Sequence, residues 1–118
     1  MVLTGSKPPQ KVWVDKTEEK GSDVNIASHL LRDAFRGRFE VAVLITNDSD
    51  LVEPVRIVRH EVEVGLPIGI LNPHQHHSVG LRAEATFMKR IRQSDIAACQ
   101  LPNPMTDATG QFHKPKTW

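Results

Sequence analysis

Two acidic residues, Asp48 and Asp50, follow an apolar run in the stretch VLITNDSDLVEP, residues 43–54. Two carboxylates this close repel each other unless a proton or a cation lies between them. Because the ligand atoms are oxygens, a hard divalent cation such as Mg²⁺ or Mn²⁺ is the natural partner. The structural alternative is that Asp50 caps the next helix, since aspartate is a common N-cap residue. That alternative leaves Asp48 unexplained.

A third acid, Asp23, stands at the start of another helical pattern, where both it and Ser22 are suitable N-cap residues. A position in the first turn would also suit its charge, because the helix dipole is positive there. If a sheet strand precedes this helix, Asp23 lies at the carboxyl edge of the sheet, beside Asp48 and Asp50. Three acids from two loops would be the minimum scaffold for a Mg²⁺-dependent hydrolytic site.

Polar residues adjoin these acids and are candidates for binding a substrate phosphate. Lys20 lies just before Asp23 and offers an ammonium group. Asn47 and Ser49 flank Asp48, and we assign them the same role. A serine nucleophile is excluded, because NDSDL lacks both glycines of the G-x-S-x-G turn.

Three histidines, His74, His76 and His77, form a second polar cluster in the stretch NPHQHHS. Their spacing matches no closed or catalytic zinc pattern. An exposed loop is the simplest interpretation, and a contact with phosphate or substrate is a second one. The sequence also lacks the G-x-G-x-x-G fingerprint of dinucleotide-binding domains.

Composition predicts one small soluble domain of 118 residues, with 39% apolar residues, 25% charged residues and a formal net charge of +1. This balance gives no overall attraction to nucleic acid or membrane. The single cysteine, Cys99, excludes an intrachain disulfide and favours a cytoplasmic location. Its apolar context predicts that it is packed and unreactive. No apolar run is long enough for a membrane span.

The elements that position these residues alternate between helical and strand patterns. The strand 39–46 is a continuous apolar, β-branched run, which is typical of a strand buried on both faces. The alternation predicts an α/β fold with a parallel sheet. We expect a flexible lead-in over residues 1–10, a domain over 11–101 and a tail over 102–118. Predicted strands are 11–14, 39–46, 65–71 and 87–91, and predicted helices are 24–35 (ended by Gly37), 51–62, 78–85 and a final turn in 94–100.

Three stretches, EEKGSDVNIASHLLRDAF, VAVLITNDSDLVEPVRIVR and GLPIGILNP, resemble the NYN domain family, a branch of the PIN-like metal-dependent ribonucleases. The resemblance covers about residues 11–101. It implies a Rossmann-like α/β sandwich around a parallel sheet, and cleavage of RNA by water with Mg²⁺ or Mn²⁺. The matching acids are Asp23 in KGSDVN, and Asp48 and Asp50 in TNDSD.

The family normally opens with a strand that ends in an Asp-x-x-Asn motif, and nothing in this sequence matches it. Asp15 lies on the wrong strand, by order, to replace the missing ligand. We therefore expect an N-terminally shortened version of the fold. Such a sheet would expose an unpaired edge beside the 39–46 strand, and a homodimer or higher oligomer would cover it.

Two further functions stay open. The first is an interaction or RNA-binding module that kept the fold but lost catalysis with the missing aspartate. The second is a component of a pyridine-derivative hydroxylase, because TEEKGSDVN and TDATGQFHKPKTW resemble a protein group credited with that reaction. His74, His76 and an aspartate would then form the two-histidine, one-carboxylate iron site.

Overall fold

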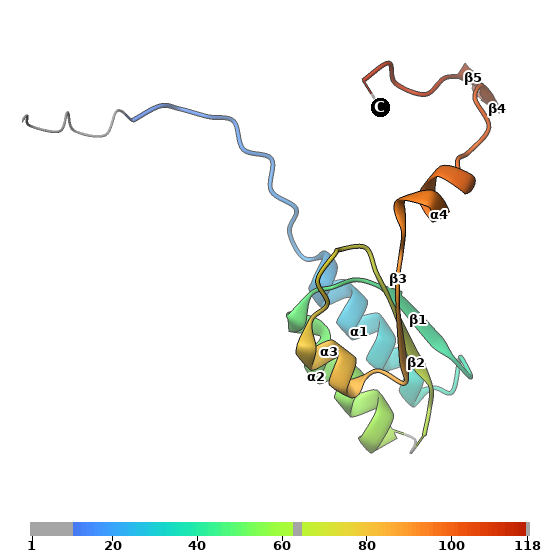
Figure 1. The fold of residues 1–118 in the computed structure, drawn as a ribbon. Helices are drawn as coiled ribbons and strands as arrows, with labels where there is room; N and C mark the ends of the chain where they lie inside the picture. Colours follow the sequence, from blue (N-terminus) through green and yellow to red (C-terminus); the bar gives the residue numbers. More distant parts are fainter. Residues whose placement is uncertain (1–10, 63–64, 118) are drawn as a thin grey trace, which may run out of the picture.

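A three-stranded parallel sheet forms the centre of the computed structural model, which describes residues 11–62 and 65–117. The strands β1 (Ala42–Ile45), β2 (Ile68–Asn72) and β3 (Phe87–Arg90) are hydrogen-bonded in the order β1-β2-β3 (Figure 1). The predicted α/β class with a parallel sheet is confirmed, and the arrangement is Rossmann-like and PIN-like. The lead-in predicted over residues 1–10 lies outside the described residues.

The helices fall where the apolar periodicity placed them. The helix predicted over 51–62 is confirmed, although it consists of a 3₁₀ turn, an α-helical part and a π-helical end. Within the part of the chain that the structure describes, no helix has the length and apolar character needed to cross a bilayer. The helical segments are α1 (Ser22–Phe35), η1 (Ser49–Leu51), α2 (Val52–Ile57), η2 (Val58–Val62), α3 (Val79–Glu84) and α4 (Gln93–Ala98).

Helix α1 ends at the predicted glycine, for a reason that the backbone shows directly. Gly37 adopts a left-handed conformation with φ of 61°. Its N–H donates to the Ala34 carbonyl at 3.0 Å, and the Arg38 N–H donates to the Asp33 carbonyl at 2.9 Å. These two bonds form a Schellman motif, which satisfies carbonyls that the end of the helix would otherwise leave free.

The start of α1 differs from the prediction. Gly21 occupies the N-cap position, so the expectation that Ser22 or Asp23 caps this helix is wrong. The Ser22 N–H instead donates to Glu19 Oε1 at 2.8 Å. Hydrogen bonds from the side chain and backbone of Ser22 hold the pKa of Glu19 below its usual range. Asp23 lies in the first turn, where the helix dipole favours its charge.

The hydrophobic core lies on the face of the sheet that α1, α2 and α3 cover (Figure 1). Ile68 and Ile70 of β2 are fully buried there. Ala42 and Leu44 of β1 and Met88 of β3 pack beside them. Leu66, in the loop before β2, is also buried, and the helices contribute the other members of the cluster: Leu30, Ala34, Leu51, Val55, Val58 and Leu81.

The opposite face of the sheet is open in the described chain, so the prediction that the 39–46 strand is buried on both faces is wrong. Val43 is 50% exposed and Ile45 is 67% exposed, and they alternate with the inward Ala42 and Leu44. A continuous apolar run does not distinguish one covered face from two. The outer edge of β1 also has no partner strand among the described residues.

One aromatic side chain lies across this open face. Phe87 of β3 is the register partner of Gly69 of β2. A Cβ atom built on Gly69 would lie 2.8 Å from Phe87 Cε1 and closer still to Cζ and Cε2. Only glycine at position 69 therefore leaves room for the ring over the central strand.

The segment before α1 forms no strand, so the strand predicted for residues 11–14 is wrong. Residues 11–20 carry no helix or strand and run away from the sheet (Figure 1). Trp13 is fully exposed, at 101% of its reference area. A β-prone sequence needs a partner strand, and this segment does not pair with the free edge of β1.

The C-terminal part contains a hairpin that the sequence pattern did not predict. Its strands are β4 (Met105–Asp107) and β5 (Gly110–Phe112). The Asp107 carboxylate holds the turn by accepting bonds from the N–H groups of Thr109 at 2.7 Å and Gly110 at 3.1 Å.

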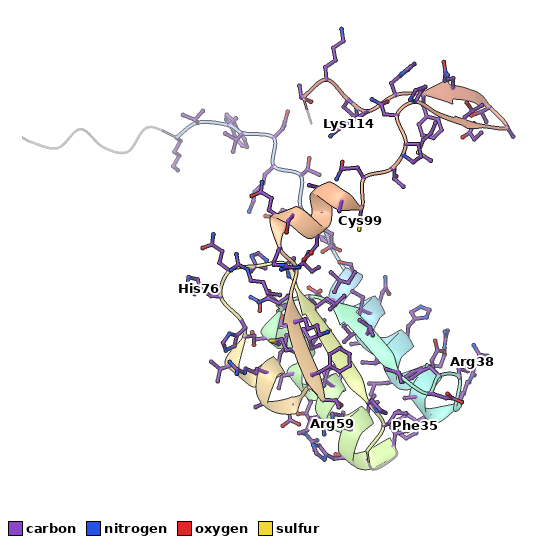
Figure 2. All side chains as sticks on the ribbon, turned by 45° about the vertical axis from the view of Figure 1, so that its right-hand side comes forward. Phe35, Arg38, Arg59, His76, Cys99 and Lys114 are labelled. Carbon is purple, nitrogen blue, oxygen red and sulfur yellow. The ribbon has the colours of Figure 1, made fainter. Side chains whose placement is uncertain are left out.

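Cys99, at the end of α4, is exposed, so the expectation that it is packed is wrong (Figure 2). Helix α4 contributes no residue to the buried core that would cover it.

Candidate functional site

Acidic residues from two separate elements meet at the carboxyl end of β1. Asp48 follows this strand, and Asp23 belongs to the first turn of α1. Desolvation raises the pKa of Asp23, and the negative charge of Asp48 and a hydrogen bond with its carboxyl group raise it further. The charges of Glu19 and Asp50 act in the same direction. Two carboxylates this close repel each other, so a proton or a cation between them would stabilise the arrangement.

Asp48 also has a structural task. Its Oδ1 accepts a hydrogen bond from the Asp50 N–H at 2.9 Å, and it is the N-cap of η1. The interpretation of Asp50 as the cap is therefore wrong. Asp48 has the extended backbone, with φ of −80° and ψ of 121°, that an N-cap residue needs. Asp50 lies inside the first turn of η1 and is exposed.

The donor atoms suit a hard cation, because all of them are carboxylate oxygens. The number of ligand side chains that come together is smaller than a metal site usually has. Across residues 11–62 and 65–117, no three histidine, cysteine, aspartate or glutamate side chains are grouped so that they could hold a metal ion. Asp23 and Asp48 lie close together, and the charges of Asp50 and Glu19 act on Asp23 by raising its pKa.

Asn47 ties a loop to the end of β1. Its Nδ2 donates to the His76 carbonyl at 3.0 Å, and its Oδ1 accepts from the Ser78 N–H at 2.7 Å. Both functional atoms of the amide are thus engaged within the protein. The histidine loop, as we call residues 73–78, therefore owes its position to the side chain that the sequence suggested for phosphate binding.

Asn72, at the end of β2, holds the same loop and was missed from the sequence. It is only 2% exposed. Its Nδ2 donates to the His76 carbonyl at 3.2 Å, and its Oδ1 accepts from the His74 N–H at 2.8 Å. The available signal was an asparagine at the carboxyl end of each of two apolar strands. Figure 2 labels His76 on this loop.

The other candidates for phosphate binding are accessible. Ser49 is exposed at the start of η1, and Lys20 is exposed two residues before α1. His74, His76 and His77 are also exposed, and His77 Nε2 lies 3.2 Å from Arg82 Nη1. Within the described ranges, the three histidines do not come together, with one another or with acidic side chains, in a group of three that could hold a metal ion.

An enzyme of Pseudomonas putida is similar in sequence to most of this chain. Over 106 residues the chain is 29% identical to the 6-hydroxy-3-succinoylpyridine 3-monooxygenase of Pseudomonas putida. The alignment covers 87% of this chain but 34% of that enzyme, so the chain spans about a third of the relative's length. No family model matches the sequence.

A solved structure supports the fold. A protein of unknown function from Vibrio parahaemolyticus superimposes with a TM-score of 0.54, at 17% sequence identity. The match covers 70% of this chain and 51% of that one. At this identity the likeness shows a shared α/β fold and nothing about activity.

Proposed function

We propose that this chain is a metal-dependent ribonuclease domain of the NYN type, which cleaves RNA with Mg²⁺ or Mn²⁺. The observation that supports the proposal is the meeting of Asp23 and Asp48 at the carboxyl edge of a parallel sheet. Ligands bind at this edge in open α/β folds. The two carboxylates repel each other in the absence of a proton or cation, and a divalent ion would relieve that repulsion.

In this proposal each side chain has a separate task. Asp23 and Asp48 would hold the ion, and Asp50 would contact it through water or orient the attacking water. A bound ion lowers the pKa of its water and offsets negative charge on the phosphate in the transition state. Lys20 and Ser49, both exposed beside the acids, would contact the substrate phosphate.

The test combines calorimetric titration with Mn²⁺ and cleavage of a labelled RNA. Asp48→Asn is the informative variant, because asparagine is an equally good N-cap and keeps η1 intact while one charge is removed. We expect it to lose both Mn²⁺ binding and cleavage. Glu40→Gln, which removes an exposed acid before β1, is the matched control and should behave like the parent. Equal cleavage by Asp48→Asn and the parent would refute the proposal.

A non-catalytic RNA-binding module is the second candidate. It is favoured by the finding that only a pair of acids, and no group of three ligands, comes together in the described residues. Under this alternative the parent binds RNA without cleaving it, with or without Mn²⁺.

The third candidate is a component of a pyridine-derivative hydroxylase. It is favoured by the similarity to the Pseudomonas putida enzyme, whose name states 3-monooxygenation of 6-hydroxy-3-succinoylpyridine. His74 and His76 with an aspartate were the proposed iron ligands. Oxygen uptake that requires this pyridine and Fe²⁺ would support the third candidate over the first two.

We further propose that a second copy of the chain is a partner, and that the protein acts in the cytoplasm. The open edge of β1 is formed by Ala-Val-Leu-Ile, without the charge or proline that usually protects an edge strand. Val43 and Ile45 add apolar surface next to it. Pairing of two such edges would bury both features.

A further inference from the structure

A hollow of about 460 Å³ lies on the far side of the sheet from β1 and was not foreseen from the sequence. Its walls come from α3, from β3 and from the histidine loop. Asn72, which is buried and holds that loop, also lines it. The hollow runs along β3, from the residues that precede this strand to Arg90 at its carboxyl end, and there it reaches the same edge of the sheet as the acidic pair.

The charges around this hollow have one sign. Arg82 and Arg90 line it, and no aspartate or glutamate does so among the described residues. Within residues 11–62 and 65–117, neither arginine forms an ion pair. Two guanidinium groups without carboxylate partners favour a ligand that carries an oxyanion, because the planar fork matches phosphate or carboxylate oxygens.

Arg82 is held in place by a neighbouring side chain. Its Nη1 lies 3.2 Å from His77 Nε2. A guanidinium group only donates, so this contact is a hydrogen bond in the His77 tautomer whose Nε2 is free to accept. Arg90 is placed by its backbone, which is the register partner of Asn72 in the sheet. Both arginines therefore stand on ordered elements of the fold, α3 and β3.

The histidine loop connects the hollow to the acids. His77 lines the hollow, and the carbonyl of the adjacent His76 accepts bonds from Asn47 and Asn72. Asn47 directly precedes Asp48. The strands β1 and β3 flank β2, so their ends are separated by roughly 10 Å, which is twice the spacing between neighbouring strands. A short stretch of oligonucleotide backbone spans that distance.

We propose that this hollow binds a phosphate group of a single-stranded RNA, at Arg82 and Arg90, while a neighbouring phosphodiester lies at Asp23 and Asp48. The inference rests on the proposed ribonuclease function and extends it by placing the substrate strand across the ends of β1, β2 and β3. Gln75, which also lines the hollow, offers a neutral donor to the same phosphate.

The first experiment measures affinity for a fluorescein-labelled single-stranded RNA by anisotropy, in EDTA so that no cleavage occurs. We expect Arg82→Gln and Arg90→Gln each to weaken binding about tenfold, as the loss of a charge-assisted hydrogen bond does. Each should also reduce the slope of log K against log salt by roughly 0.7, the contribution of one phosphate contact to a single strand.

The matched control is Arg36→Gln, which removes the same group from the exposed C-terminal end of α1. It should leave affinity and salt slope unchanged. Asp48→Asn should lose cleavage in Mn²⁺ without weakening RNA binding in EDTA, because the substitution removes a negative charge that repels phosphate when no metal ion is bound. A failure of the proposed catalysis can therefore be distinguished from a failure of the hollow. Equal affinity of the parent and both hollow variants would overturn the inference.

A second measurement uses only the parent protein, so it does not depend on the folding of any variant. Inorganic phosphate and succinate are titrated separately, and amide chemical shifts are followed by NMR. We expect phosphate to shift Gln75, His77, Arg82 and Arg90, and to saturate at a lower concentration than succinate. Tighter binding of succinate would assign the hollow to a carboxylate ligand and overturn the phosphate assignment. Shifts scattered elsewhere would overturn the site itself.

Discussion

The packing of Phe87 over Gly69 leads to a prediction about the stability of the sheet. Gly69→Ala would place a Cβ atom 2.8 Å from Phe87 Cε1 and closer to two other ring carbons. The backbone of β2 is fixed between two strands, so the ring has to move. Phe87 is 40% exposed, and the open face gives it space to swing into solvent.

The cost follows from the burial that the ring would lose. A buried aromatic residue removes roughly 150–250 Å² from water. Since Phe87 is 40% exposed, it is more than half buried. Complete loss of that burial would cost about 3 kcal/mol, at about 25 cal/mol per Å². If the ring moves off the strand, it loses part of that burial, which costs about 1–2 kcal/mol of stability. Replacing glycine by alanine stabilises the strand by about 0.5–1 kcal/mol, because it restricts the unfolded chain. We expect net destabilisation of about 1 kcal/mol.

The assay is urea denaturation followed by circular dichroism, with the free energy of unfolding compared between parent and variant. The second arm repeats the substitution in a Phe87→Ala background, where no ring meets the new methyl group. There Gly69→Ala should stabilise the protein by about 0.5–1 kcal/mol, so the sign of its effect reverses. An identical effect in both backgrounds would show that the ring does not lie over β2, and the reasoning would be wrong.

Three further predictions concern the site and the open edge. The pKa of Asp23 is raised in the folded protein, so its ionised form opposes folding once the pH exceeds the ordinary carboxyl pKa. Asp23→Asn should therefore raise the melting temperature at pH 7. The difference in melting temperature between variant and parent should disappear as the pH falls below about 4. Asn47→Ala removes two hydrogen bonds to the histidine loop and should cost about 1–2 kcal/mol in chemical denaturation, with faster proteolysis at that loop; an unchanged midpoint and cleavage rate would contradict its anchoring role. Light scattering at micromolar concentration should show an oligomer for the parent and a monomer for Val43→Lys, whereas a monomeric parent would refute self-association through β1.

The sequence predicted the elements that have a local cause. Helical spacing placed α1, α2 and α3, and the apolar runs placed β1 and β2. Gly37 was predicted to end α1 because a left-handed residue after a helix is usually glycine. Each of these features depends on residues only a few positions apart, so a single sequence is sufficient to predict it.

Errors arose where two local interpretations were equally good. Asp48 and Asp50 are both N-cap residues by type, and only the backbone conformation assigned the cap to Asp48. Ser22 and Asp23 were equally plausible caps of α1, yet Glu19 supplies the acceptor. Residues 11–14 have strand propensity but no strand beside them. A propensity states what a segment can adopt, while its neighbours decide what it does adopt.

The tertiary structure alone decided what lies together. It brought Asp23 of α1 close to Asp48, which follows β1, engaged Asn47 in holding the histidine loop, and lined one hollow with Arg82 and Arg90. It also left one face of β1 open, which an apolar run cannot reveal. The physical reason is that periodicity records whether a residue is buried, whereas proximity depends on how strands are ordered and how the chain crosses between them. The sequence therefore identified the acids as candidate metal ligands, whereas the fold determined that Asp23 and Asp48 lie close together.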